Sequence, residues 1–352
     1  MSVVGRDRPV MHQFLAAATP HDAVTNQALA LQEILAAGGL RTGIVAEHVD
    51  AALADRVQRL QARRMPRVPI LLRYSIWSAA AKAALEHTHR VGLIYHNITP
   101  PELLGRANPA VAALCSRGRR ELPRIVARSS LWVADSAFNA TDLQEAGAPG
   151  VRVIPLILNL PRLAMPPAAP SHDVLFVGRI APSKRIEDLI DAVALLRRHH
   201  LPTARLRVIG DWSAFPGYRR SVGEHARRNG LADAVLFPGS VTDAERDRAM
   251  TASGAYLTMS EHEGFCVPLL EAMAHGLPVV ARDAGAVRET AGGAALILRD
   301  RNPRVAAAAL SAVLSNPTVR IGLAAHTERR LDEINPQRVG AQLQRVVEEL
   351  IA

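Results

Sequence analysis

The feature of this sequence that most constrains its fold is the segment 256–289, which reads YLTMSEHEGFCVPLLEAMAHGLPVVARDAGAVRE. Tyr256 to Met259 is a short apolar run rich in strand-forming residues, which predicts a buried strand. A polar loop follows, then a helix that Pro268 opens and Gly276 closes, and then a second strand-like run at 279–281. A strand–loop–helix–strand unit of this kind builds parallel sheets.

Two carboxylates, Glu263 and Glu271, frame the loop of this unit. In α/β folds, ligands bind at the carboxyl ends of the strands, where the free N–H groups of a helix N-terminus favour an anion. Here those groups belong to the residues near Phe265, Cys266 and Val267. A carboxylate is also a good acceptor for neighbouring hydroxyls, as on a ribose or a hexose. We expect Glu271 in the first turn of the helix; a structural role beside the helix dipole, with a solvated Glu263, is the alternative.

The string EGFCVPLLEAMAHGLPVVARDAGAVRET, residues 263–290, resembles the Glu-x7-Glu signature of family 4 retaining glycosyltransferases, which have the GT-B fold. Beyond the two glutamates, the match includes the Gly-Phe pair, the Pro at the helix start, Glu-Ala-Met, Gly-x-Pro-Val-Val and Glu289. The resemblance implies that Glu271 holds the nucleotide ribose. It also implies that Glu263 contacts the donor sugar together with the residues that follow it, which are Gly264, Phe265, Cys266 and Val267.

Length and composition fit this interpretation. A chain of 352 residues suits two domains better than one, and 49% hydrophobic residues is ordinary for a globular protein. No apolar run is long enough to span a bilayer and the charged N-terminus does not suit a secretory signal, so we expect a cytoplasmic protein. Cys115 and Cys266 are too few for a disulfide framework or a zinc site.

The chain is basic, with a formal net charge of +9 that comes almost entirely from arginine. Such a surface can meet nucleic acid, an anionic membrane or an anionic substrate. Aromatic residues make up only 4% of the chain, so nucleic-acid binding is not expected. As a helix, residues 54–67 would align Arg56, Arg59 and Arg63 on one face, and 119–128 repeats the pattern. A basic face can rest on anionic lipid headgroups or simply be solvated, and both remain open.

Strand-like runs alternate with other segments through the first half of the chain, at 10–17, 42–47, 69–78, 91–99, 131–136 and 151–158. In the turn after the first run, His21, Asp22 and Thr25 could line a phosphate. The glycines of a dinucleotide fingerprint are missing there, so we interpret Asp22 as a helix N-cap.

His96 follows the strand predicted near 91–99 and precedes a helix expected near Pro101. The segment YHNITPPELL resembles segments of a subset of family 4 enzymes, in which a histidine after a strand of the N-terminal domain lies by the donor sugar and the acceptor. This resemblance makes His96 a candidate catalytic residue, with Asn97 and Thr99 behind it. A structural histidine is the alternative.

A segment with four prolines, residues 159–172, predicts a stiff linker and a domain boundary. We expect an acceptor-side Rossmann-like domain over 1–158 and a nucleotide-sugar-binding domain over 173–333. As the resemblance implies for GT-B proteins, a closing helix within 334–352 should pack back on the first domain.

The second half opens with a buried strand that runs into Gly178 and Arg179, and a helix begins near Lys184. Gly178 lets the backbone approach a ligand closely. Arg179 and Lys184 are two cations beside a helix N-terminus, which is what a leaving pyrophosphate requires. The Gly-Arg-x4-Lys pattern also resembles the diphosphate-binding loop of the family. Ser183 is explained sufficiently as the N-cap of the helix.

Two later strands, near 206–211 and 235–243, end in segments that hold the nucleotide base in the family. On that resemblance we assign donor-binding roles to Gly210, Asp211, Ser240 and Val241. Strand-end glycines are common in any α/β sheet, so an ordinary structural role is the alternative for Gly210.

The resemblance thus implies an α/β protein with the GT-B fold, in which two doubly wound Rossmann-like domains flank an interdomain cleft. We expect a retaining transfer of a hexose from a GDP- or UDP-sugar to a saccharide or lipid-linked acceptor, in polysaccharide or glycolipid synthesis. No acidic dyad stands at a strand end, so no metal cofactor is expected. A nucleotide-sugar epimerase, a non-catalytic nucleotide-sugar-binding protein and a membrane- or nucleic-acid-binding module remain alternatives. Peripheral contact with the anionic inner face of a membrane stays open.

Overall fold

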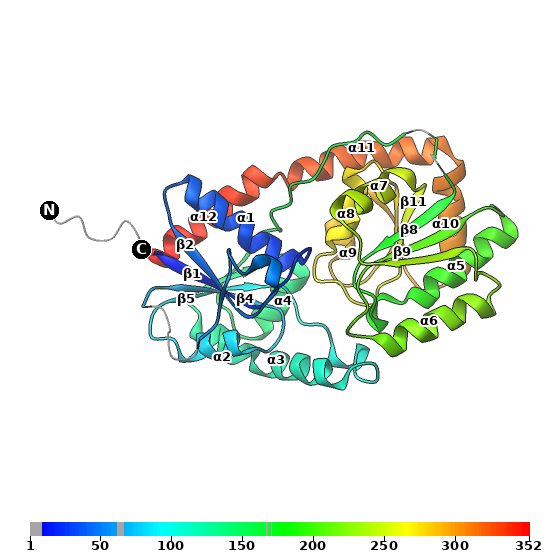
Figure 1. The fold of residues 1–352 in the computed structure, drawn as a ribbon. Coiled ribbons are helices and arrows are strands. Elements are labelled where there is room, and N and C mark those ends of the chain that lie inside the picture. The colour runs from blue at the N-terminus through cyan, green and yellow to red at the C-terminus, as the bar shows by residue number, and fades with distance from the viewer. Residues whose placement is uncertain (1–8, 62–66, 167, 170) are drawn as a thin grey trace. The chain divides into compact units, whose positions relative to one another are not determined.

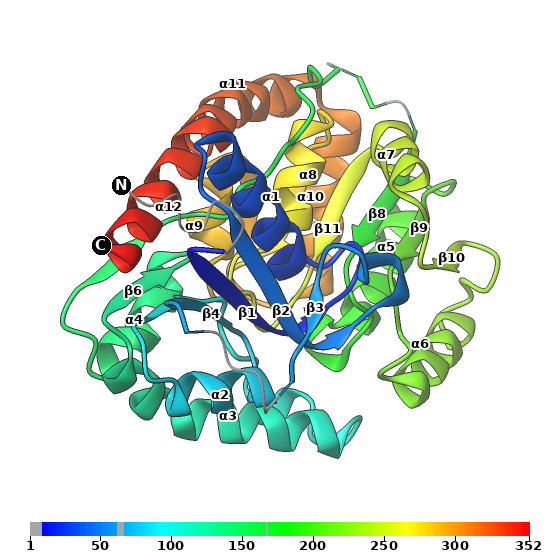
Figure 2. The same cartoon turned by 60° about the vertical axis from the view of Figure 1, so that its left-hand side comes forward.

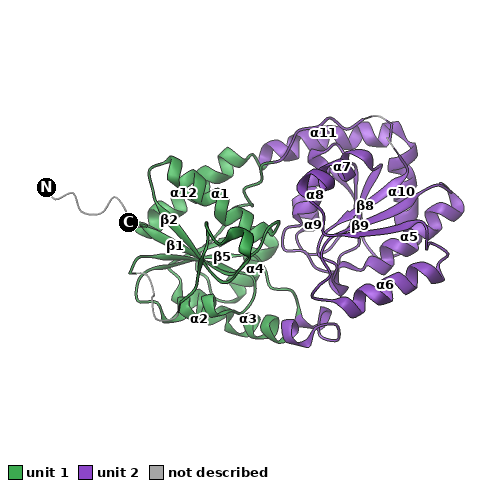
Figure 3. Ribbon diagram, viewed as in Figure 1, with its two compact units in different colours: residues 1–100, 113–159, 334–352 green, residues 101–112, 160–333 purple. Residues whose placement is uncertain are grey.

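The computed structural model describes residues 9–61, 67–166, 168–169 and 171–352, and the chain divides into two compact units (Figure 3). Unit 1 comprises residues 1–100, 113–159 and 334–352, and unit 2 comprises residues 101–112 and 160–333. The chain therefore enters unit 2 briefly at residues 101–112, passes to it again at the start of the Pro-rich segment, and returns to unit 1 with its final residues.

Within the described residues, unit 1 is built on a parallel sheet of seven strands in the order β3-β2-β1-β4-β5-β6-β7 (Figures 1 and 2). The strands are β1 (Met11–Ala18), β2 (Thr42–Val49), β3 (Gln58–Arg59), β4 (Ile70–Tyr74), β5 (Val91–Tyr95), β6 (Leu131–Ala134) and β7 (Val151–Val153). Every residue of β4 and β5 is buried, as expected for central parallel strands covered on both faces. The strand order reverses between β1 and β4.

The helical segments of unit 1 are α1 (Ala23–Ala37), η1 (Ala51–Leu53), α2 (Ala79–Glu86), α3 (Pro109–Arg128), α4 (Ala137–Glu145) and α12 (Pro336–Ile351). The short η2 (Pro101–Leu103) and the first four residues of α3 belong to unit 2. The side chain of Asp22 accepts a hydrogen bond from the N–H of Thr25 at 2.9 Å, which confirms Asp22 as the N-cap of α1. Helix α12 lies beside α1 (Figures 1 and 2), and its Leu343 packs with Leu31 and Leu35 in one core cluster. The closing helix therefore completes the core of unit 1.

The described part of unit 2 contains a parallel sheet of six strands in the order β10-β9-β8-β11-β12-β13. They are β8 (Asp173–Val177), β9 (Arg205–Ile209), β10 (Val235–Gly239), β11 (Ala255–Thr258), β12 (Val279–Arg282) and β13 (Ala295–Leu298). The chain adds β9 and β10 on one side of β8 and then returns to add β11, β12 and β13 on the other. The strand order thus reverses between β8 and β11, which is the position where open α/β sheets bind ligands.

The helical segments of unit 2 are η3 (Pro182–Lys184), α5 (Ile186–His199), α6 (Pro216–Arg228), α7 (Asp243–Ala252), α8 (Val267–Ala274), α9 (Val287–Ala291), α10 (Pro303–Ser315) and α11 (Pro317–Glu333). Leu189, Val193 and Leu310 are fully buried in the main core cluster, where α5 and α10 pack against the sheet. The segment 256–289 becomes β11, α8, β12 and α9, as the opening pattern predicts for all but the last of these.

The prediction of a basic helix over residues 54–67 is wrong. Arg56 lies in a turn after η1, where its guanidinium pairs with Glu33 at 2.7 Å, and Arg59 lies in β3. Arg63 falls outside the described residues. Val57 is buried and the N–H of Leu60 donates to the carbonyl of Ala46 in β2, so pairing with a distant strand overrides the local helical spacing.

Three further local predictions are corrected. Ser183 is a buried residue within η3 and not the N-cap of α5; that position belongs to Arg185, which has the left-handed φ of 51°. Glu271 is the fifth residue of α8 and so lies beyond its first turn. Near Pro101 the chain forms only the short η2, because the long helix α3 begins at Pro109.

Candidate functional site

The candidate site lies at the carboxyl ends of β8 and β11, where the strand order of unit 2 reverses. The loop after β8 runs from Gly178 to Lys184, and the loop after β11 runs from Ser260 to Cys266. A backbone hydrogen bond of 2.8 Å from the N–H of Glu261 to the carbonyl of Ser183 joins the two loops. The two segments that the sequence assigns to diphosphate and to donor sugar are therefore neighbours.

The loop after β9 joins them from the other side. The N–H of Ile180 donates to the carbonyl of Asp211 at 2.7 Å. A Cβ built on Gly210 would lie 1.8 Å from the carbonyl oxygen of Gly178, and Gly210 has a φ of +150°. Only glycine permits this approach, so Gly210 has a specific structural reason to stand where it does. The structure brings Gly178, Gly210 and Asp211 together.

Lys184 and Glu263 form the central charge pair of the site. The ammonium Nζ lies 2.7 Å from the carboxylate Oε1, and the two side chains are 20% and 11% exposed. The loop that carries Glu263 is held from behind, because the carbonyl of Glu263 accepts from the N–H of Ala286 at 2.9 Å. A Cβ on Gly285 would lie 2.2 Å from that same carbonyl oxygen.

Helix α8 presents its N-terminus to this charge pair. Within the described chain, no residue accepts a hydrogen bond from the N–H groups of Phe265, Cys266 or Val267. Cys266 is buried with a left-handed φ of 71°, and burial, followed by the Glu263 carboxylate, raises the pKa of its thiol. The thiol is therefore protonated at neutral pH, so the positive end of the helix dipole and the ammonium of Lys184 are not offset by a thiolate.

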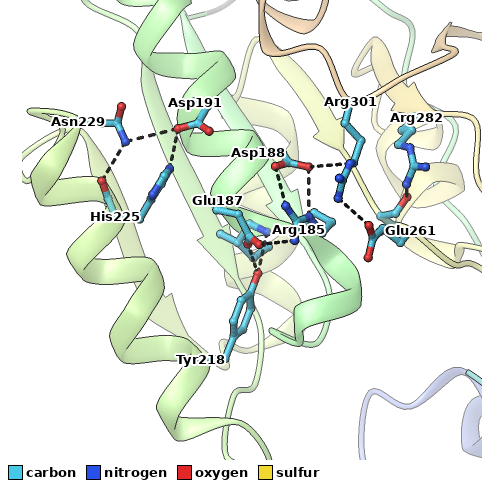
Figure 4. Close-up of polar contacts among 12 residues, drawn as sticks. Arg185, Glu187, Asp188, Asp191, Tyr218, His225, Asn229, Glu261, Arg282 and Arg301 are labelled. Carbon is cyan, nitrogen blue, oxygen red and sulfur yellow. Dashed lines mark hydrogen bonds and ion pairs between the residues drawn. The ribbon is translucent and has the colours of Figure 1, made fainter. Parts of the chain in front are cut away.

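The other helix N-terminus at this edge, that of α5, is already satisfied. The N–H of Ile186 donates to the hydroxyl of Tyr218 at 2.9 Å, and that hydroxyl donates to Glu187 (Figure 4). Glu187 and Asp188 stand in its first turn and pair with Arg185. An anion would meet two carboxylates there, so α8 is the N-terminus of the two that is suited to a phosphate.

Glu271 lies on the second turn of α8, with a side chain that is 16% exposed. Its Oε1 is 3.7 Å from Nη1 of Arg246 on α7. Burial raises the pKa of Glu271, and the charges of Arg246 and then His275 act in the opposite direction. Arg246 therefore favours the ionised form of Glu271, whereas burial and the nearby Asp247 and Asp243 raise its pKa.

Tyr256 lies close enough to Glu263 and Glu271 for both charges to act on its phenol. The sequence predicted only a strand residue at this position. Burial raises the pKa of this phenol, and the nearby Cys266, Glu263 and Glu271 raise it further. Its hydroxyl donates to the carbonyl of Val177 at 3.3 Å, so the floor of the site connects β11 to β8.

Three of the predicted site residues, Arg179, Ser240 and Val241, have no side-chain contact with this cluster among the described residues. Arg179 is exposed and makes no ion pair or side-chain hydrogen bond with another described residue. Ser240 is exposed and Val241 is half-buried in the loop between β10 and α7, at the end of the strand that pairs with β9.

His96 lies in unit 1, immediately after β5, and its side chain is 3% exposed. Its Nδ1 lies 2.6 Å from Oδ2 of Asp135, and its Nε2 lies 3.5 Å from Nη1 of Arg73. Arg73 is buried, and its guanidinium donates to the side-chain oxygens of Gln13 and Gln27. Asn97 donates to Asn139 at 2.9 Å. The histidine is therefore part of a buried polar network of unit 1.

Backbone strain marks the same edges in both units. Among the described residues, the non-glycine residues with positive φ are His21, Asn97, Arg185 and Cys266. They follow β1, β5, β8 and β11 respectively, in every case at the carboxyl side of the strand. Left-handed backbone costs about 1 kcal/mol or more for a residue with a Cβ, and such strain concentrates at functional sites.

The described residues contain no group of three or more His, Cys, Asp or Glu side chains that could hold a metal ion. None of the helices in the described part of the chain has the length and apolar character that crossing a bilayer needs.

The chain is similar to known proteins both in sequence and in fold. Residues 167–333, which are nearly all of unit 2, match the family model described as "Glycosyl transferases group 1". The chain is also similar in structure to the sucrose-phosphate synthase of Thermosynechococcus elongatus, with a TM-score of 0.79 and 20% sequence identity over 97% of this chain and 99% of that one. The chain therefore has the GT-B fold that the sequence predicts, and most of its second unit is similar to group 1 glycosyl transferases.

Curated relatives resemble a part of the chain. The D-inositol 3-phosphate glycosyltransferase of Kineococcus radiotolerans is 34% identical over 186 residues, which are 48% of this chain and 42% of that protein. The GDP-mannose-dependent alpha-mannosyltransferase of Mycobacterium tuberculosis is 32% identical over 114 residues, which are 32% of this chain and 26% of that protein. The chain thus matches less than half the length of these relatives.

Proposed function

We propose that this chain is a retaining family 4 glycosyltransferase, with Glu263 and Glu271 as its Glu-x7-Glu pair. It moves a hexose from a nucleotide-diphosphate sugar to a saccharide or lipid-linked acceptor, in polysaccharide or glycolipid synthesis. The observation that carries the proposal is the Lys184–Glu263 pair beside an α8 N-terminus whose first amides have no acceptor in the described chain. A diphosphate supplies the negative charge that this arrangement lacks.

The pair also suggests how the donor engages. When the diphosphate binds Lys184, the carboxylate of Glu263 is released from its 2.7 Å contact. It can then accept hydrogen bonds from the hydroxyls of the sugar. Because Glu263 starts as the partner of Lys184, the site keeps no unpaired buried charge before the donor arrives.

The chemical step breaks the bond between the anomeric carbon and the diphosphate oxygen, and the electron pair leaves with the diphosphate. Lys184, the exposed Arg179 and the α8 amides stabilise that developing charge, with no need for a metal ion. The acceptor hydroxyl attacks the oxocarbenium-like sugar from the face that the diphosphate leaves, and its proton passes to the departing phosphate oxygen. The product keeps the anomeric configuration, and no side chain acts as a covalent nucleophile.

The donor carries GDP or UDP as its nucleotide. The loops after β9 and β10, with Gly210, Asp211, Ser240 and Val241, hold the base. The name of the mycobacterial relative specifies GDP-mannose, which supports testing a GDP-sugar first. His96 would act next to the donor sugar and the acceptor.

Thermal unfolding with GDP-mannose, UDP-glucose and ADP-glucose tests the proposal, because a ligand that binds only the folded state stabilises it by about 2.7 kcal/mol at a hundred times its Kd. One donor should raise the Tm, and incubation with that donor and a saccharide should release nucleoside diphosphate with or without EDTA. NMR of the product should show the donor's anomeric configuration. An isomerised sugar formed without acceptor would instead identify an epimerase, and binding without turnover would identify a nucleotide-sugar-binding protein.

We further propose a cytoplasmic enzyme that touches an anionic membrane through α3. With the 54–67 helix excluded, α3 offers the better surface, because Leu114 is 43% exposed and Arg117 and Arg120 are exposed beside it. Replacing Arg117, Arg120 and Arg124 with Gln should reduce flotation with phosphatidylglycerol vesicles, whereas replacing the exposed Arg198, Arg227 and Arg228 of unit 2 should not. Equal flotation of both variants would remove α3 as the contact surface.

A further inference from the structure

Arg246 stands at an unusual place on α7. The helix starts at the N-cap Thr242, whose capping box with Glu245 fixes the first turn directly after Val241. Arg246 is the fourth residue of α7 and therefore points a cation toward the positive end of a helix dipole, which is the less favourable end for it. A cation in that position needs compensating acids, and the structure provides three.

The acids surround the guanidinium of Arg246 from two helices. Nη1 lies 2.7 Å from Oδ1 of Asp243 and 3.7 Å from Oε1 of Glu271, and Nη2 lies 3.2 Å from Oδ1 of Asp247. The Nε of Arg246 is buried and has no hydrogen-bond partner among the described residues. Asp243 and Asp247 belong to α7 itself, whereas Glu271 belongs to α8. Arg246 therefore joins the helix after the β10 loop to the acid that we assign to the ribose.

We propose that Arg246 is a positioning residue that keeps the Glu271 carboxylate ionised and oriented as an acceptor for the ribose hydroxyls of the donor nucleotide. The inference rests on the proposed function, since it takes the ribose as the partner of Glu271. It adds to that function a residue that neither the sequence motif nor the family match assigns.

The groups that face Glu271 explain why a cation is needed there. On α7 these are Arg246, Asp243 and Asp247, and just after α8 the Nδ1 of His275 donates to the backbone carbonyl of Glu271 at 2.7 Å. From β11 the phenol of Tyr256 lies within range of the Glu271 charge. The guanidinium of Arg246 therefore faces three carboxylates in this group, those of Asp243, Asp247 and Glu271.

The pH dependence has a defined sign. Burial raises the pKa of Glu271, and Arg246 is the largest opposing influence. Without Arg246 the pKa of Glu271 must rise further, so the carboxyl group would protonate at a higher pH and lose acceptor capacity. An opposite charge at this range lowers a carboxyl pKa, so its removal should move the acid limb of nucleotide binding to higher pH.

The experiment measures binding of GDP, UDP and ADP by calorimetry from pH 5 to pH 8, so that turnover is not needed. The variant Arg246→Gln should shift the acid limb of binding of the preferred nucleotide to higher pH and weaken its binding at pH 6. Arg246→Lys should restore much of the wild-type profile. Arg248→Gln, which removes an exposed arginine two residues further along α7, is the matched control and should leave the profile unchanged.

Glu271→Gln provides the readout that a merely structural role of Arg246 would not produce. This variant should lose the acid limb, and adding Arg246→Gln to it should change binding little further, because the two residues act on one contact. A wild-type acid limb in a folded Arg246→Gln variant overturns the proposal, as does an additive double variant. Failure of the wild-type protein to bind all three nucleotides would instead overturn the proposed function.

Discussion

The two sheets carry polar side chains at the same edge, yet the two units use them differently. In unit 2, Lys184 and Glu263 are partly exposed, and they stand beside helix amides that have no acceptor in the described chain. In unit 1, Arg73 and His96 are almost inaccessible, and their partners are Gln13, Gln27 and Asp135. The edge in unit 2 has groups that suit an anion, whereas the polar side chains at the edge in unit 1 already hydrogen-bond to one another.

This difference has an electrostatic reason. A buried guanidinium that donates to neutral amide oxygens keeps its charge without a direct carboxylate, and burial lowers the pKa of Arg73 to about 9. Asp135 is the nearby charge that opposes this shift. In unit 2 the largely buried carboxylates of Glu263 and Glu271 each have a cation nearby. Lys184 lies 2.7 Å from Glu263, and Arg246 lies 3.7 Å from Glu271. Unit 2 therefore holds the ion pair, Lys184 with Glu263, whose cation can change its partner for an anionic ligand.

Replacing Lys184 should give the largest functional effect. Lys184→Met removes a cation next to the leaving diphosphate, and kcat should fall by roughly a hundred- to a thousandfold, as for the loss of a single oxyanion donor. The chain offers a matched control in its other lysine, since Lys82 on α2 is 64% exposed and far from any predicted site residue in sequence. Lys82→Met should leave kcat and Tm unchanged in steady-state assays and thermal scans.

If Lys184→Met lowered the Tm by many degrees while leaving the kcat of the folded fraction intact, the pair would be structural. Unit 2 would then resemble unit 1, and the comparison between the two edges would fail.

Replacing Arg73 should give the largest effect on stability instead. Arg73→Met leaves the side-chain oxygens of Gln13 and Gln27 buried without their donor, and each unsatisfied group costs about 1 to 3 kcal/mol. Chemical denaturation should show a loss of a few kcal/mol in the free energy of unfolding. Adding Gln13→Leu and Gln27→Leu should recover part of it, because removing both sides of a buried polar contact costs less than removing one.

The Arg73 variants also test whether His96 has a role in the reaction or only in the structure. Recovery of stability in the triple variant without recovery of turnover would show that the network holds His96 for the reaction. Recovery of both would make the network structural alone.

The strands and the central motif were predictable because their signals are local. The strands β5 and β11 are short runs buried at every position, and β4 is buried throughout although Arg73 interrupts its apolar residues. The spacing of Glu263 and Glu271 placed both at one helix N-terminus, although Glu271 lies one turn later than expected.

The features that the sequence did not reveal depend on contacts between distant residues. Arg73 reaches Gln13 across sixty positions, and Arg246 reaches Glu271 across helices. Neither pair has a spacing that a pattern could detect. The 54–67 segment shows the converse, since a helical arginine spacing was overridden when Leu60 paired with Ala46.

Cys266 permits the finest test of the difference between the units. Its left-handed φ of 71° suits glycine, so Cys266→Gly should relieve about 1 kcal/mol of backbone strain, while the loss of a small buried side chain offsets a similar amount. The free energy of unfolding should therefore change little, whereas Cys266→Ala keeps the strain, loses the thiol and should be the less stable variant by up to about 1 kcal/mol.

The same comparison at Asn97, which has a φ of 69° in unit 1, should favour the native residue, because Asn97→Gly removes a hydrogen bond to buried Asn139. Denaturant titrations of the Gly and Ala variants at both positions would show which strained residue can be replaced with the smaller loss in the free energy of unfolding. A large loss for Cys266→Gly would mean that the contact of its thiol with Glu263 stabilises the loop as much as the amide network stabilises unit 1.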